Sequence, residues 1–207
     1  MESKILDKTQ IAKGLSYIAE HLVEIAEAIN NELCKTMTGD CESDWQDTRD
    51  KVSRAFDALS PKHGISDRLP RNELGLVALE AMSSLVKVAG GYQRIFFMID
   101  MLREVEFDAV FMDSLGSISR KTFESVVALK NMADSYDENP DALTIGREAI
   151  ASLERQVDEE HLIICRQISV ATEEHPDYVC YLMRKIVGEL EHITDHLLDF
   201  AETVEGF

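Results

Sequence analysis

Apolar residues recur at spacings of three and four along most of the chain, which is the period of an amphipathic α-helix. The first such segment covers residues 5–37. A shorter one begins at a capping residue, Ser43 or Asp44, and ends at Leu59. Four longer helices are then expected over residues 73–103, 111–136, 140–172 and 179–204. No segment alternates with a period of two between turn residues, so the pattern predicts an all-α protein without a sheet.

The connections between these segments contain helix-ending and capping residues. Gly39 and Asp40 end the first helix, the stretch 60–72 contains two prolines, and Asn139-Pro140 is typical of a helix start. The break near residues 106–108 has no glycine or proline. A helix of 30 residues extends about 45 Å. Long helices with short connections favour an antiparallel bundle.

Composition and charge exclude several classes of protein. The chain has 207 residues, 45% of them hydrophobic, and a formal net charge of −18. A charge of this sign repels phosphate backbones and anionic lipids, so no nucleic-acid partner is expected. The longest uncharged apolar run, residues 95–99, is far shorter than the roughly 20 residues of a membrane helix. With no signal peptide visible near Met1, we expect a soluble cytoplasmic protein that does not insert into the membrane. Its cysteines are expected to be reduced thiols: Cys34, Cys41, Cys165 and Cys180.

Acidic residues spaced four apart occur on the last two predicted helices. The pairs are Glu154 with Asp158 and Glu191 with Asp195. Residues at i and i+4 share a helix face, so each pair directs two carboxylates to one place. Such pairs on neighbouring helices would offer four oxygen donors to a divalent cation. A chain with 39 acidic residues has about seven such pairs by chance, so spacing alone favours a solvated surface.

Two alternatives follow from other patterns. Glu189 and His192 have the Glu-x-x-His spacing of di-iron bundles, and Asp158 and His161 repeat it with a shorter acid. An inward di-metal carboxylate bundle, acting as a ferritin-like oxidase or storage protein, would bury these residues as ligands. A metal-free helical adaptor would use its acids only for solubility. The sequence has none of the common nucleophile or phosphate-loop motifs, and we expect no enzyme activity. Gly90-Gly91 lies inside a helical pattern and predicts a close helix approach.

The C-terminal part of the chain resembles PhoU-like domains. The resemblance lies in two segments of the sequence: Leu190-Glu191-His192-Ile193-Thr194-Asp195-His196 with Phe200-Ala201-Glu202, and Leu153-Glu154 with Val157-Asp158. They are similar to the LERIGDH…NIAE signature and to the ExxxD motif of that family. The resemblance implies six helices arranged as two three-helix bundles, with halves of about residues 1–106 and 107–207. It also implies a non-enzymatic cytoplasmic accessory or regulator of phosphate uptake, with an inner-membrane phosphate transporter or its sensor as partner.

The resemblance further implies a surface metal site for iron, zinc or another divalent cation. Its motif positions are Glu154, Asp158, Glu191 and Asp195. In the first half the corresponding positions are occupied by Val86 and Gly90, and the second helix has no clear ExxxD motif. The metal site is therefore expected in the second half alone. The apolar third helix is compatible with a homodimer, although no particular residue in the sequence specifies one.

Overall fold

The computed structural model describes residues 5–38, 45–59, 66–102, 109–135, 139–171 and 178–205. Over these residues the chain is all-α, without a strand. A short 3-10 turn covers Ser66–Arg68, and the six helices are α1 (Lys8–Thr38), α2 (Trp45–Leu59), α3 (Glu73–Leu102), α4 (Ala109–Ser135), α5 (Pro140–Ala171) and α6 (Tyr178–Glu205). The predicted all-α class and six helices are confirmed, and the helix ends differ from the predicted ones by a few residues.

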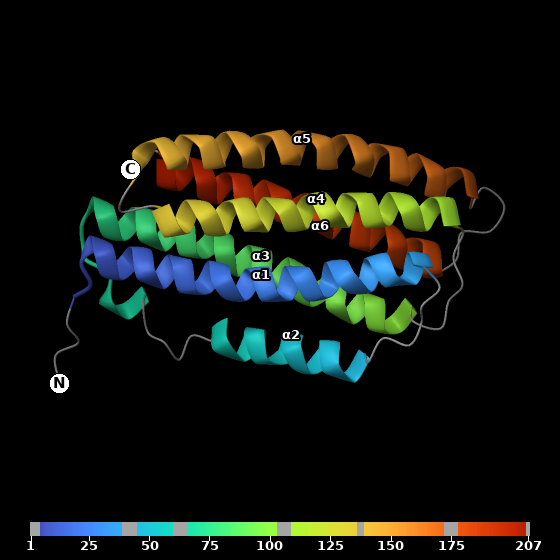
Figure 1. Cartoon of the computed structure of the whole chain (residues 1–207), viewed down its shortest axis with the longest axis horizontal. Helices are drawn as coiled ribbons and strands as arrows, with labels where there is room; N and C mark the ends of the chain where they lie inside the picture. The colour runs from blue at the N-terminus through green and yellow to red at the C-terminus, as the bar shows by residue number, and fades with distance from the viewer. Residues whose placement is uncertain are drawn as a thin grey trace.

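The helices lie side by side along the long axis of the molecule, and consecutive helices run in opposite directions (Figure 1). In the second half α4, α5 and α6 contact one another pairwise and form a three-helix bundle. In the first half α1 contacts both α2 and α3. The most extensive contacts, however, join the halves, α1 with α4 and α3 with α6. The predicted boundary between residues 106 and 107 lies outside the described residues.

One connected core holds the helices together. It contains buried apolar side chains from all six helices. On α6 the buried positions recur at the spacings of three and four that predicted the helix, including Leu190, Ile193, Leu197, Ala201 and Val204. The short helix α2 joins the core through Trp45, whose ring stacks on Phe96 of α3 with centroids 5.0 Å apart. The apolar stripes read from the sequence are therefore the faces that pack.

Polar side chains begin two of the helices. Asp7 Oδ1 accepts a hydrogen bond from the backbone N–H of Gln10 at 2.9 Å, and Gln10 Oε1 accepts one from the N–H of Asp7 at 3.2 Å. This reciprocal pair satisfies two amides that a helix start leaves open. At the start of α3, Asn72 Oδ1 accepts from the N–H of Gly75 at 3.2 Å. The predicted caps Ser43 and Asp44 lie outside the described residues.

Helix α3 is more apolar than its packing requires. By length and composition it could cross a membrane, yet only 39% of its most apolar window is buried inside the protein. Its buried side packs on α1 and α6. Its outer side keeps exposed apolar residues, including Val86 and Phe97. The structure therefore leaves one apolar face of α3 uncovered.

Candidate metal centre

Carboxylates from α5 and α6 meet on the surface of the second bundle. Glu154 and Asp158 project from α5, and Asp195 projects from the antiparallel helix α6. One oxygen from each of these three side chains lies within 4.8 Å of the other two. All three are partly buried. Three of the four residues predicted from the two acidic pairs are therefore brought together, and we call these three with Glu191 the acidic cluster.

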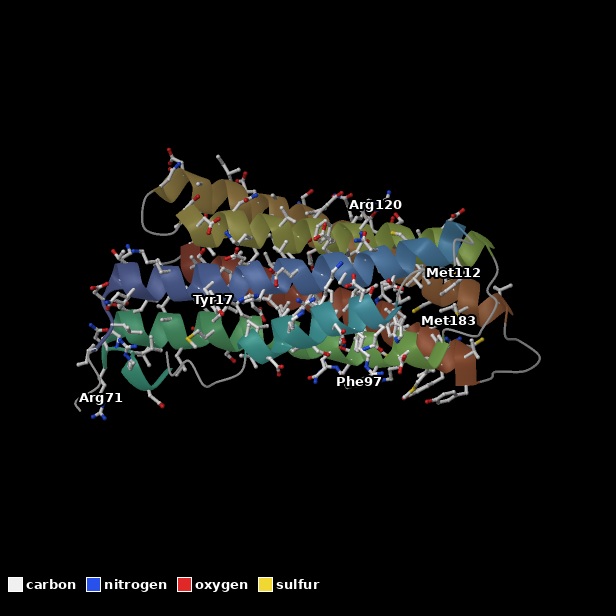
Figure 2. All side chains as sticks on the ribbon, turned by 60° about the horizontal axis from the view of Figure 1, so that its bottom comes forward. Tyr17, Arg71, Phe97, Met112, Arg120 and Met183 are labelled. Atoms are coloured by element: carbon white, nitrogen blue, oxygen red, sulfur yellow. The ribbon has the colours of Figure 1, made fainter. Side chains whose placement is uncertain are left out.

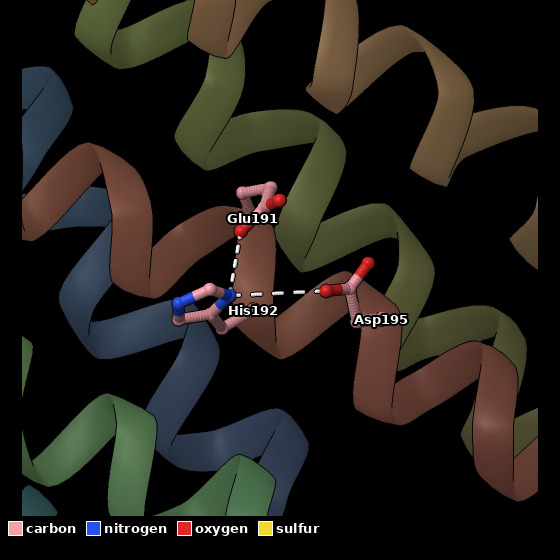
Figure 3. Close-up of side chains that lie close together, drawn as sticks. All are labelled: Glu191, His192 and Asp195. Carbon is pink, nitrogen blue, oxygen red and sulfur yellow. Dashed lines mark ion pairs between the residues drawn. The ribbon is translucent and has the colours of Figure 1, made fainter.

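Glu191, the fourth residue, belongs to a second group that shares Asp195 (Figure 3). Its Oε2 atom lies 2.7 Å from Nδ1 of His192, and the same Nδ1 lies 3.8 Å from Oδ2 of Asp195. The side chain of His192 is 64% exposed, whereas that of Glu191 is 20% exposed. Asp195 thus links a group of three carboxylates to a group that contains an imidazole.

The carboxylates of the acidic cluster destabilise one another's charged forms. Burial raises the pKa of Glu154 above its ordinary 4.5, and the neighbouring charges of Asp158 and Asp195 raise it further. Burial also raises the pKa of Glu191, and Asp195 adds to this effect. His192 and His161 act in the opposite direction on Glu191. Both glutamates respond to charges on the other helix, so the two acidic pairs form one electrostatic unit.

One oxygen of this unit is buried without compensation. Oδ1 of Asp158 has no solvent contact and no hydrogen-bond partner among the described residues. A buried carboxylate oxygen is normally hydrogen-bonded, because desolvating it without a partner is costly. A divalent cation would neutralise the repelling charges and use this oxygen as a ligand. The donor set therefore fits a cation of this class.

His161 and Cys165 also lie near the acidic cluster. The four metal-site residues predicted from sequence did not include them. His161 lowers the pKa of Glu191. The pKa of the Cys165 thiol is raised mainly by burial; Arg184 lowers it, and the charge of Glu191 raises it. On α5 the residues Glu154, Asp158, His161 and Cys165 follow one another at spacings of four, three and four. This spacing places all four residues on one stripe of the helix, and it is the sequence pattern from which His161 and Cys165 could have been found.

Glu189 and His192, the Glu-x-x-His pair of the di-metal alternative, do not point together into the bundle. Oε2 of Glu189 accepts a hydrogen bond from Arg94 of α3 at 2.8 Å, which ties α3 to α6. The other member of the Glu-x-x-His motif, His192, is largely exposed to solvent. A di-metal site inside the bundle needs both side chains buried and directed inward. These two residues therefore do not form such a site.

The first half has no comparable group of metal-binding side chains among the residues that the structure describes. Both groups of three or more such side chains lie in the second half, on α5 and α6. On α2 the side chain of Asp47 forms an ion pair with Lys51 at 2.8 Å, and Asp50 Oδ1 accepts from Gln46 at 2.9 Å. On α3 Val86 is exposed and offers no donor atom. The candidate ligand groups of the described residues therefore all lie on α5 and α6.

Neither family models, curated proteins nor solved structures give a match to this chain. The resemblance to PhoU-like domains therefore stays a prediction that depends on the quoted residues of α5 and α6.

Proposed function

We propose that this protein is a non-enzymatic cytoplasmic accessory or regulator of phosphate uptake, and that its acidic cluster binds a divalent cation. The observation that supports the proposal is the meeting of Glu154, Asp158 and Asp195. The resemblance to PhoU-like domains singled out these positions from sequence. With so many acidic residues in the chain, two pairs from different helices would more often diverge into solvent than converge.

The donor set indicates which cations would be bound. Glu154, Asp158 and Asp195 would supply carboxylate oxygens, which suit hard cations such as magnesium and manganese. Imidazole nitrogen, which His192 would add, suits iron and zinc. The residues that would hold the cation therefore come from both α5 and α6, and a bound cation would link the two helices.

A bound cation would change the surface that the protein presents to a partner. Without it, the acidic cluster repels anionic groups, and with it, about half of the formal negative charge of the four carboxylates is neutralised. A phosphate transporter or its sensor protein that contacts this bundle face would then distinguish the two states. This coupling is how the acidic cluster would act in regulation without chemistry of its own.

Phosphate uptake in cells tests the proposal. Cells of the source organism that lack this chain would be complemented with the wild type, with an Asp158→Asn/Asp195→Asn variant, or with a Glu20→Gln/Glu27→Gln variant. The last pair is exposed on α1 and removes the same charge away from the acidic cluster. We expect the wild type and the α1 variant to restore regulated uptake, and the cluster variant to fail at equal protein level. Uptake that does not depend on the chain would contradict the assignment to phosphate transport.

The metal-free adaptor differs from this proposal in one measurable property. A cation that binds only the folded state must raise its apparent stability. Full complementation by the cluster variant, with no effect of chelator on thermal unfolding of the wild type, would favour the adaptor.

A further inference from the structure

A band of exposed apolar side chains follows the outer face of α3 and continues onto the first turn of α6. Its large side chains are all more than half exposed: Leu76, Leu79, Val86, Phe97, Met101, Tyr178 and Tyr181. The Tyr178 hydroxyl donates to Sδ of Met101 at 3.6 Å, which joins the two parts of the band. Figure 2 shows Phe97 at the outer edge of α3. A monomer's largest apolar patch is usually about 300–600 Å². Five large exposed side chains on one face of α3 and two on α6 are more than the scattered single apolar residues of an ordinary surface, which indicates an interaction surface.

The two ends of the band have different shapes and charges. At the start of α3 lies a groove of about 500 Å³ between α3 and the last turns of α6. Its walls include apolar, acidic and basic side chains: Leu76, Leu79, Glu80, Lys87, Asp199 and Glu202. The other end carries the aromatic rings of Phe97, Tyr178 and Tyr181, and Nζ of Lys185 lies 5.8 Å from the centroid of the Tyr181 ring. One end is a mainly acidic groove, and the other offers aromatic side chains and a lysine.

These ends are complementary under a two-fold rotation, and we infer that the occupant of the band is a second copy of this chain. Two α3 helices placed antiparallel about a point near residue 88 bring large residues opposite large ones and a small residue opposite Val86. The facing pairs are Leu76 with Met101, Leu79 with Phe97, and Val86 with Gly90. A symmetric dimer requires this kind of surface, in which residue i contacts j and j contacts i.

The same rotation pairs opposite charges. Because α6 runs antiparallel to α3, its first turns lie beside the end of α3 and its last turns beside the start of α3. The dimer therefore brings Lys185 of one copy to the acidic groove of the other, near Glu202, at two equivalent places. This pairing provides specificity for a second copy, whereas the net charge of −18 opposes docking on an anionic membrane surface. A standard interface buries about 800 Å² per partner, a size that a band along a 30-residue helix can supply.

The molar mass in solution tests the inference. By sedimentation equilibrium at micromolar concentration and physiological salt, we expect the wild type to have twice the chain mass of 23.3 kDa. Val86→Glu places a charge near the two-fold axis and should give the single-chain mass with unchanged helical circular dichroism. Leu162→Glu is the matched control, because Leu162 is similarly exposed on α5, away from the band. A wild type that is monomeric, or a dimer that Leu162→Glu disrupts as strongly as Val86→Glu, would overturn the inference.

A charge exchange provides a second test that misfolding cannot imitate. Lys185→Glu and Glu202→Lys should each weaken the dimer at least tenfold, because each places like charges at both equivalent contacts. The double variant restores opposite charges and should recover most of the lost affinity. A double variant as weak as the single ones would contradict the proposed two-fold arrangement.

Discussion

Gly91 of α3 lies directly against Ile193 of α6. A Cβ atom at Gly91 would be 2.7 Å from Cγ1 of Ile193, closer than two such atoms can approach. Both residues are buried at the contact between α3 and α6, one of the two most extensive contacts between the halves of the chain. The close helix approach predicted from Gly90-Gly91 is therefore confirmed at Gly91, whereas at Gly90 a Cβ would meet only the guanidinium of Arg94 at 3.3 Å.

Substitution of glycine by alanine should have opposite effects at two helix positions. At Gly91, repacking around the new methyl group costs about 1–3 kcal/mol. The higher helix propensity of alanine returns about 1 kcal/mol. We expect Gly91→Ala to lower the free energy of unfolding by about 1 kcal/mol. At Gly188 of α6 a Cβ meets nothing within 4 Å, so Gly188→Ala should raise it by about 1 kcal/mol. Urea unfolding at one protein concentration measures both, and equal effects would contradict the close contact.

Tyr92 is fully buried, and its hydroxyl has no hydrogen-bond partner within the described part of the chain. Burial raises the pKa of this hydroxyl far above its ordinary value. An unpaired buried hydroxyl is destabilising, and its removal without a change of shape relieves that cost. We expect Tyr92→Phe to raise the free energy of unfolding by about 1 kcal/mol. A loss of stability in the same urea experiment would show that the hydroxyl has a partner.

The acidic cluster should make the metal-free protein less stable as pH rises. Burial and neighbouring charges raise the pKa values of Glu154 and Glu191 above 4.5, so the folded state binds protons more tightly than the unfolded state. Stability due to these groups is then present below pH 4.5 and is lost as pH rises through their raised pKa values. The Glu154→Gln/Glu191→Gln variant should therefore gain stability relative to wild type between pH 4.5 and 7 in the presence of chelator. The free energies of unfolding of the two proteins are measured by urea unfolding at each pH. If their difference does not change with pH, the charged forms of Glu154 and Glu191 are not destabilised in the folded state.

The sequence predicted the helices well, because apolar stripes at helical spacing are buried in one core. It also predicted which acids share a helix face, since spacing of four is a local property. Spacing alone could not predict that α5 and α6 have the register that brings Asp195 to Glu154 and Asp158. Such register depends on packing between helices, as at Gly91 and Ile193, and leaves no periodic signal in one segment.

The sequence also could not predict which face of α3 is exposed or which residue pairs with Glu189. Helix α3 is apolar on more than one side, and the sequence could not distinguish a fully buried helix from one with an uncovered face. The motif Glu189-x-x-His192 suggested ligands, but its glutamate pairs with Arg94, which is 95 residues distant in the chain. Only the tertiary structure reveals these pairings.

Cation binding by the acidic cluster is the central claim, and thermal unfolding of chelator-treated protein with added manganese, zinc or anaerobic ferrous iron tests it most directly. We expect at least one of these cations to raise the melting temperature of the wild type and of Glu20→Gln/Glu27→Gln. At one hundred times the dissociation constant, the stabilisation is about 2.7 kcal/mol. Asp158→Asn/Asp195→Asn should show no such shift. A wild type that no cation stabilises, or a cluster variant that is stabilised equally, would contradict cation binding by the acidic cluster.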